Sequence, residues 1–217
     1  MENYKKNFRK IKGFIKKYSK KFWFLLWKDD SIKGWVFSII FLVVFIKLIF
    51  LPGLSLLTGT KLPLAIVESC SMYHQGNLFS DYDSWWQRHE NKYNNFNITK
   101  TQFEDFSFKK GFNKGDIIFI VKAVPENLKI GDVIIFQTNR KNPIIHRIIN
   151  IQKKNNELIF STIGDNNNGQ LQAEKEIHEN QIIGKAVFRL IPYIGWGKLI
   201  FFEFTRKPQE RGFCHEN

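Results

Sequence analysis

Three side chains with nucleophilic or acid–base chemistry occur in separate short motifs. Ser71 lies in Glu-Ser-Cys-Ser-Met, His146 in Ile-Ile-His-Arg-Ile-Ile, and Asp165 in Gly-Asp-Asn-Asn-Asn-Gly. A serine hydroxyl is a useful nucleophile only when a base takes its proton, and an imidazole with an ordinary pKa of about 6.5 suits that transfer at neutral pH. A carboxylate can orient the imidazole and stabilise its cationic form. These residues are therefore candidates for a serine hydrolase site.

Each motif also has an ordinary structural explanation, as a turn serine, a core histidine and a turn-forming Asp-Asn pair. His74 is a competing base, but side chains on a strand alternate between faces, so it would reach Ser71 only through a turn. We favour His146, because the apolar strand residues around it would hold its ring rigidly.

One segment is apolar enough to cross a bilayer. Residues 35–57 approach the roughly 20 apolar residues that a membrane-spanning helix needs, and we predict such a helix over residues 34–57. The segment is longer than the apolar part of a cleavable signal peptide and begins too far from the N-terminus. Pro52-Gly53 is expected to end or kink the helix, and Lys47 to extend its ammonium toward the interface.

Positive charge is concentrated before this segment. The chain carries 33 Lys and Arg against 20 Asp and Glu, a net charge of +13, and residues 1–33 hold eleven of these cations against three acids. Cytoplasmic flanks are rich in Lys and Arg, so we predict a cytoplasmic leader with an interfacial helix bearing Trp23 and Trp27. No RNA- or DNA-binding motif occurs, so anionic lipid, not nucleic acid, is the expected partner.

Beyond residue 58 the pattern changes to short strands. Each apolar segment is bounded by Gly, Pro or Asn and is rich in Ile, Val and Phe. No long amphipathic helix separates them, which predicts a mainly β, antiparallel domain over residues 58–204 and a polar tail over 205–217. The expected strands are 64–68, 116–121, 132–137, 144–151, 157–163 and 182–190.

Two segments of this domain differ from the strand pattern. Residues 74–113 carry many aromatic side chains among polar ones without a clear period. We predict an insertion packed on the domain; a lid or membrane-touching surface is the alternative. Residues 193–204 are too short to span a bilayer, which favours a peripheral or core-packing helix.

The motifs together resemble a known family. Glu-Ser-x-Ser-Met, Gly-Asp-Val-Ile-Ile-Phe, His-Arg-Ile, Gly-Asp-Asn-Asn and Ile-Pro-Tyr-Ile-Gly look like the ordered blocks of type I signal peptidases of the archaeal and endoplasmic-reticulum branch, over roughly residues 60–200. The resemblance implies Ser71 as nucleophile, His146 as base, Asp165 as supporting carboxylate, and Ser69 with the Ser71 backbone N–H as oxyanion donors. It also implies the compact β-ribbon fold shared with LexA-like self-cleaving repressors, with an apolar surface resting on the membrane.

The chain departs from the family in three places. Tyr73-His74 stand where an acidic residue and proline are usual, residues 169–172 lack the family's second aspartate, and the 74–113 insertion is large. The bacterial branch uses a lysine base, but Lys122 and Lys141 do not stand at the corresponding block and are poorer candidates.

The two cysteines predict neither a disulfide framework nor a metal site. Cys70 and Ser71 are adjacent, so on a strand they would point to opposite faces, and we expect Cys70 to serve packing. Cys214 lies in the polar tail. No phosphate-binding glycine loop occurs either, so we expect no cofactor.

The resulting hypothesis is a single-pass serine endopeptidase that removes signal peptides from secretory preproteins. The expected location is the plasma membrane, or the endoplasmic-reticulum membrane in a eukaryote, with the catalytic domain outside the cytoplasm. A catalytically degenerate binding module of the same fold is the alternative, since the second aspartate is missing. A self-cleaving repressor relative would instead need a lysine base and a DNA-binding domain. Accessory subunits and substrate preference are not specified by the sequence.

Overall fold

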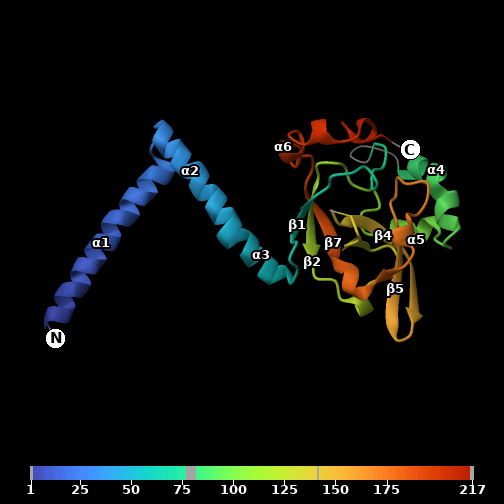
Figure 1. Ribbon diagram of the computed structural model, residues 1–217, viewed down its shortest axis with the longest axis horizontal. Helices are drawn as coiled ribbons and strands as arrows, with labels where there is room; N and C mark the ends of the chain where they lie inside the picture. The colour runs from blue at the N-terminus through green and yellow to red at the C-terminus, as the bar shows by residue number, and fades with distance from the viewer. Residues whose placement is uncertain (1, 77–81, 141, 216–217) are drawn as a thin grey trace. The chain divides into compact units, whose positions relative to one another are not determined.

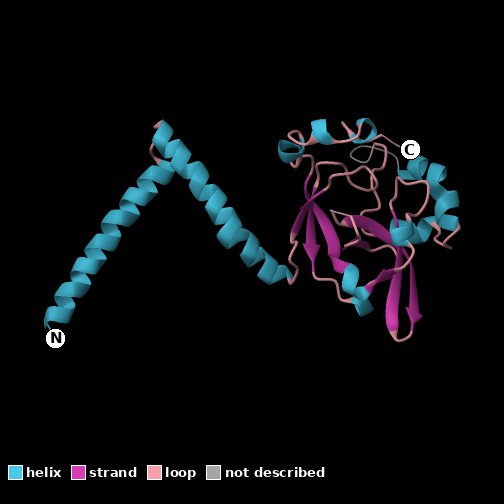
Figure 2. Cartoon of the chain, in the orientation of Figure 1, coloured by secondary structure: helices cyan, strands magenta, loops and turns pink. Residues whose placement is uncertain are grey.

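A computed structural model of the chain describes residues 2–76, 82–140 and 142–215. The described chain forms two compact units, residues 1–54 and 55–217. Figure 1 traces the elements in chain order, and Figure 2 separates the helices from the strands.

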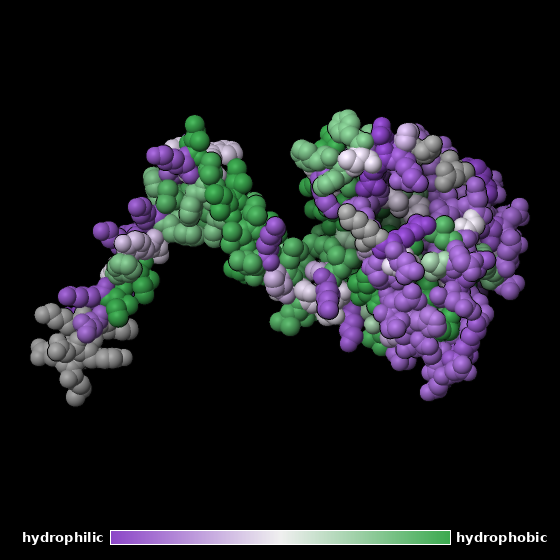
Figure 3. Space-filling model, viewed as in Figure 1, coloured by the Kyte–Doolittle hydropathy of each residue, from purple (hydrophilic) through white to green (hydrophobic). Residues whose placement is uncertain are grey.

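The first unit is helical. Helix α1 covers Glu2–Trp27, and a second helical run begins at Ile32, where the Ser31 side chain accepts a hydrogen bond of 3.2 Å from the Gly34 N–H. This run comprises α2 (Ile32–Phe45), a π-helical turn (Ile46–Phe50) and α3 (Leu51–Thr58). Its 27 residues are long and apolar enough to cross a membrane, and hydrophobic side chains cover α2 in Figure 3. The run is therefore a candidate membrane span.

The helix does not end at Pro52-Gly53, one of the two outcomes expected there. It continues to Thr58 because a π-helical turn lies directly before the proline. Proline lacks an N–H and its ring crowds the carbonyl four residues earlier, here that of Leu48. Leu48 lies in the π-turn, in which the backbone is wider than in an α-helix.

The second unit is built on one curled antiparallel sheet of seven strands in the order β1-β2-β7-β3-β4-β5-β6. The mainly β fold is therefore confirmed, and each of the six expected strands is present. The two-residue strand β6 was not expected, because so short a segment carries no alternation. The strands are β1 (Leu64–Ile66), β2 (Ile117–Val121), β3 (Val133–Phe136), β4 (Ile144–Lys154), β5 (Glu157–Ile163), β6 (Ile177–His178) and β7 (Ile182–Ile191).

Buried side chains from β2, β3 and β7 join the loop after β1 into one core cluster. Ile118 and Ile120 of β2 alternate with less buried neighbours, as expected for a strand with one face inward. Met72, one residue after the candidate nucleophile, is also buried in this cluster. The loop after β1 is thus anchored to the core at Met72.

The aromatic insertion packs on the domain, as predicted. It contains α4 (Tyr82–Asn94) and α5 (Lys100–Glu104), which begins at a capping box of Thr99 and Gln102. Its side chains form a second core cluster with Ile149 and Ile163 of the sheet; the buried members from the insertion are Trp85, Trp86, Tyr93, Ile98 and Phe103. Residues 77–81 of the expected insertion lie outside the described residues.

The chain ends in short helical turns. They are α6 (Trp196–Leu199) and two 3-10 turns, Glu203–Thr205 and Pro208–Glu210; three others cover Pro125–Asn127, Gln172–Glu174 and Glu179–Gln181. Leu199 is buried, whereas Phe201 and Phe204 are 76% and 82% exposed. The segment 193–204 is therefore peripheral, with one residue packed inward.

The two cysteines form a disulfide, which corrects the expectation that Cys70 serves packing alone. Cys70 and Cys214 are 144 residues apart in sequence, and their Cα atoms lie 5.3 Å apart. The pairing escaped sequence reasoning because Cys214 lies in a polar tail that shows no sign of returning to the start of the domain.

Candidate active site

Ser69, Ser71 and His146 line one cavity of about 760 Å³. Ser69 and Ser71 lie in the loop after β1, and their hydroxyl oxygens are 3.1 Å apart. Apolar residues of β1 and β4, among them Leu64, Ile66 and Ile144, line the same cavity. The structure therefore places a hydroxyl and an imidazole that are 75 residues apart in the sequence in the lining of one cavity.

Backbone hydrogen bonds hold the loop that carries Ser71. The Ser71 carbonyl accepts a bond of 2.8 Å from the N–H of Asn166, and the Met72 carbonyl accepts one of 2.9 Å from Phe112. The turn after β5 thus fixes the serine loop directly. The Gly-Asp-Asn motif therefore helps to position Ser71 through the backbone N–H of Asn166.

His146 lies on β4 opposite Ile134 of β3, and its side chain is almost fully buried. Its Nδ1 donates a hydrogen bond to Oε1 of Glu174, whose side chain is also buried. This pairing fixes the ring tautomer, because Nδ1 keeps the proton and Nε2 carries the free lone pair. Nε2 is thus the atom that can act as a base in the cavity.

Glu174 is itself held by two further donors. Thr162 Oγ1 donates to Oε1 at 3.3 Å, and the Leu171 N–H donates to Oε2 at 2.6 Å. The residue ends the 3-10 turn Gln172–Glu174, which follows the Gly-Asp-Asn turn. A buried carboxylate with several donors is fixed in place, so it can hold the imidazole in one orientation.

Asp165, expected to orient His146, lies in a different network. Its carboxylate accepts hydrogen bonds from Arg147 Nε (3.0 Å) and Nη2 (2.7 Å), from the Tyr93 hydroxyl (2.8 Å) and from His74 Nε2 (2.8 Å). The reason is strand geometry. His146 and Arg147 are neighbours on β4 and point to opposite faces, and Asp165 lies on the Arg147 side. The carboxylate beside His146 is Glu174 instead.

The structure thus shows two buried carboxylates, one bonded to His146 and one bonded to Arg147, and a serine hydroxyl that lines the cavity.

No family model matches the chain. Among curated proteins, it is 27% identical to a human putative signal peptidase complex catalytic subunit SEC11B over 111 residues, which are 48% of this chain and 66% of that protein. It is related to the SEC11 catalytic subunits of signal peptidase complexes.

Two further SEC11 proteins show the same relationship. The human SEC11C subunit is 24% identical over 107 residues, 46% of this chain and 55% of that protein. The SEC11 subunit of Candida tropicalis is 30% identical over 104 residues, 45% of this chain and 61% of that protein. The chain thus matches between about half and two thirds of the length of these SEC11 relatives. The resemblance to the archaeal and endoplasmic-reticulum branch is confirmed.

The environment of Asp165 explains its charge state. Burial alone would raise the pKa of Asp165, but the guanidinium of Arg147 and the hydrogen bonds from His74 and Arg147 outweigh it and hold the pKa well below the usual range. Arg147 is fully buried and also donates to the carbonyls of Ser107, Phe108 and Gly131. This pair ties the aromatic insertion to β4 and to the turn after β5.

His74, the competing base, belongs to this second network. Its ring stacks on Trp85 at 3.6 Å between centroids and is 2% exposed. Burial lowers the pKa of His74 to about 4, against the opposing effect of Asp165. His74 is therefore neutral at pH 7, and its Nε2 proton is committed to Asp165.

Lys122, one of the two lysine alternatives, is not among the residues that line the cavity. Lys122 is exposed, and its backbone N–H bonds the Thr58 carbonyl. Lys141 lies outside the described residues. Glu174 was not predicted, because the resemblance implied an aspartate within residues 169–172, and Glu174 is a glutamate two residues beyond this segment. A search for either carboxylate over a few more residues would have found it.

Proposed function

We propose that the chain is a membrane-bound serine endopeptidase that removes signal peptides from secretory preproteins. One observation carries the proposal: Ser71 and His146 line the same cavity, and the ring of His146 is oriented by a buried carboxylate. The relationship to SEC11 catalytic subunits supports this reaction class.

In the proposed mechanism, Ser71 Oγ attacks the carbonyl carbon of the scissile peptide bond while His146 Nε2 takes the hydroxyl proton. The Ser71 backbone N–H and the Ser69 hydroxyl donate to the oxyanion. The imidazolium then protonates the leaving amine, which breaks the C–N bond and leaves an acyl ester on Ser71. Water attacks this ester while His146 takes its proton. The imidazolium then gives this proton to the Ser71 oxygen as the ester C–O bond breaks, which releases the signal peptide and the free serine.

Glu174 is the positioning residue in this scheme. Its carboxylate stabilises the imidazolium that forms when His146 takes the serine proton. Asp165, which the family motif implied as the supporting carboxylate, stabilises the fold instead. It compensates the buried charge of Arg147 and accepts a hydrogen bond from His74.

We propose that the leader lies in the cytoplasm, that Ile32–Thr58 crosses the bilayer and that the sheet domain lies outside. The Cys70–Cys214 disulfide supports this orientation, because disulfides persist in oxidising compartments. A membrane anchor raises the effective concentration of enzyme toward substrates in the same membrane. The relatives are named as subunits of a complex, which favours accessory subunits here as well.

The degenerate binding module is the second candidate. Its main argument was the missing second aspartate, and Glu174 supplies a carboxylate at His146 in its place. Cleavage of the preprotein distinguishes the two candidates, because the endopeptidase cleaves it and the binding module only binds it.

The test uses the full chain in liposomes with a labelled preprotein. We expect the wild type to release the signal peptide, and the Ser71→Ala and His146→Ala variants to lose this cleavage. Ser69→Ala should retain part of it, because one oxyanion donor remains. Undiminished processing by Ser71→Ala would reject the serine mechanism. Binding of the preprotein without cleavage by the wild type would favour the binding module.

A further inference from the structure

We infer that the C-terminal segment 203–215, called the strap below, positions the Ser69–Ser71 turn for catalysis. The inference rests on the proposed function and deepens it, because it assigns positioning roles to Arg206 and Cys214. Residues 205–217 were expected to be a polar tail. The strap is instead attached to the residues directly before the proposed nucleophile.

Arg206 makes the first attachment. Its Nη1 donates to the backbone carbonyl of Glu68 at 3.1 Å, and its Nη2 bonds Glu68 Oε2 at 3.1 Å. Glu68 directly precedes Ser69, so the guanidinium holds the peptide group that leads into the proposed oxyanion donor. Arg206 also lines the cavity with Ser69 and Ser71, and its side chain is only 18% exposed.

The disulfide makes the second attachment. Cys214 of the strap is bonded to Cys70, which lies between Ser69 and Ser71. The Asn166 side chain joins the same two segments, since its Nδ2 lies 3.1 Å from the Cys70 carbonyl and 2.9 Å from the His215 carbonyl. The turn is therefore held at Glu68 and at Cys70, on both sides of Ser69.

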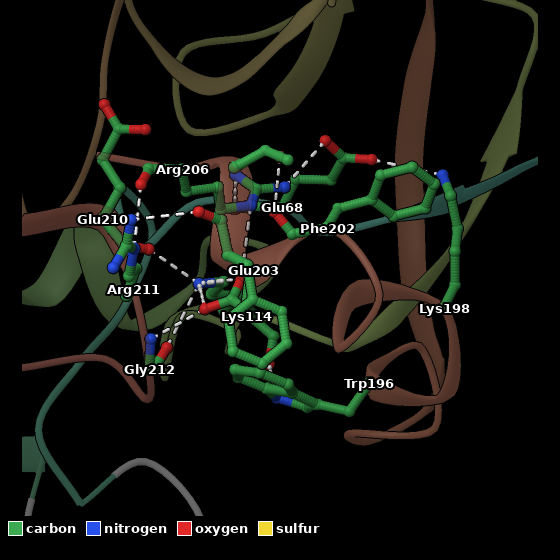
Figure 4. A network of polar contacts seen from close by, with 12 residues as sticks. Glu68, Lys114, Trp196, Lys198, Phe202, Glu203, Arg206, Glu210, Arg211 and Gly212 are labelled. Carbon is green, nitrogen blue, oxygen red and sulfur yellow. Dashed lines mark hydrogen bonds and ion pairs between the residues drawn. The ribbon is translucent and has the colours of Figure 1, made fainter. Parts of the chain in front are cut away.

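Lys114 gives the strap a defined shape. Its ammonium is buried and bonds Glu203 Oε2 (2.9 Å) and the carbonyls of Glu210 (2.7 Å) and Gly212 (3.2 Å). Glu203 Oε1 also lies 2.8 Å from the ammonium, so one carboxylate and two carbonyls surround its three protons. Figure 4 shows these residues converging on Lys114, with Trp196 beside its side chain and Arg206 reaching toward Glu68.

Glu68, which Arg206 binds, also contacts residues from other parts of the cavity lining. Glu68 Oε2 accepts from Asn142 Nδ2 at 3.1 Å, and Lys198 Nζ lies 3.3 Å from Oε1. Asn142 and Lys198 both line the cavity. Arg206 therefore fixes a carboxylate that connects the β3–β4 loop to the chain just before the proposed nucleophile.

Loss of the strap contacts should lower the rate of turnover more than it weakens substrate binding. A displacement of a reacting group by about 1 Å can reduce a rate on the order of 100-fold, because the serine must meet both the imidazole and the substrate carbonyl. Release of the strap removes the Arg206 contacts of Glu68 and the disulfide of Cys70, but leaves His146, Glu174 and the apolar part of the cavity in place. The maximal rate should fall in both variants, and KM should change little in Cys214→Ser, because Cys214 is not among the residues that line the cavity.

The test compares Arg206→Gln and Cys214→Ser with Lys207→Gln in the whole 217-residue chain in detergent. Lys207 is exposed and adjacent to Arg206, so its substitution removes the same charge from the same segment. We expect kcat to fall on the order of 10- to 100-fold in Arg206→Gln and in Cys214→Ser, and to stay unchanged in Lys207→Gln. Thermal unfolding reports whether each variant is folded.

Hydrogen exchange of the backbone amides of Tyr73, Asn166 and Phe112, which donate to the carbonyls of Cys70, Ser71 and Met72, provides a readout that does not need activity. We expect faster exchange there in Arg206→Gln and Cys214→Ser, with β4 and β5 unchanged. Unchanged kcat and exchange in both folded variants would overturn the inference, as would a loss of activity that follows unfolding of the whole domain. If the wild type shows no Ser71-dependent cleavage but exchange rises in the variants, the proposed function fails and the positioning of the turn stands.

Discussion

His146 and Glu174 form a hydrogen-bonded pair in which both side chains are buried, 3% and 0% exposed. A carboxylate in this position decides which ring nitrogen keeps the proton. It therefore determines whether Nε2 can accept a proton from Ser71.

Glu174→Gln should reduce kcat on the order of 100- to 10,000-fold, because a neutral amide neither stabilises the imidazolium nor enforces the tautomer. KM should change little, since Glu174 is not among the residues that line the cavity. The measurement is steady-state cleavage of a signal-peptide substrate. The matched control is Glu176→Gln, two residues away, whose exposed carboxylate pairs with Lys154 at the surface. Equal activity of wild type and Glu174→Gln would contradict the assigned role.

Asp165→Asn should destabilise the domain by about 3 to 5 kcal/mol, because it leaves the buried guanidinium of Arg147 without its counter-charge. Thermal or denaturant unfolding in detergent measures the effect. Asp83→Asn removes an exposed carboxylate from the insertion and should change the stability by less than about 0.5 kcal/mol. A fully stable but inactive Asp165→Asn variant would show that Asp165 acts in catalysis instead.

The stability of the domain should decrease as the pH falls from 6.5 toward about 4, because of His74. Burial lowers the pKa of His74 from 6.5 to about 4, so in this window the unfolded chain binds a proton that the folded chain does not. Stability is therefore complete above pH 6.5 and is lost as the pH approaches the folded pKa, by at most about 3 kcal/mol. The midpoint of thermal unfolding, measured from pH 7.5 to pH 4, reports this loss.

The His74→Gln variant should show a shallower decrease over the same range. His178→Gln serves as the surface control, since His178 is exposed at the edge of the sheet. The same slope in wild type and His74→Gln would indicate that another group causes the acid sensitivity.

Alkylation should find no free thiol in the oxidised protein, because Cys70 and Cys214 are paired. After denaturation without reductant, mass spectrometry should detect no adduct, and after reduction it should detect two. Reduction should also lower the stability by about 2 to 5 kcal/mol, since the bridge closes a long loop. Added reductant should not alter the stability of Cys214→Ser. Two adducts without reductant would exclude the disulfide.

Local patterns predicted most of the fold. The six longer strands were found because each is an apolar segment between Gly, Pro or Asn residues, and the candidate membrane span because its length and composition are unusual. The continuation of the helix past Pro52 was not predictable in the same way, since it depends on a π-turn formed by otherwise ordinary apolar residues.

The sequence by itself determined the strands, the apolar helix and the order of the serine, histidine and Gly-Asp-Asn motifs, because these depend on neighbouring residues. Only the tertiary structure decided which carboxylate meets His146. The alternation of side chains along β4 sends His146 and Arg147 to opposite faces, so Glu174 meets the imidazole and Asp165 the guanidinium. The return of Cys214 to Cys70 was likewise decided by long-range packing around Lys114, which no local pattern encodes.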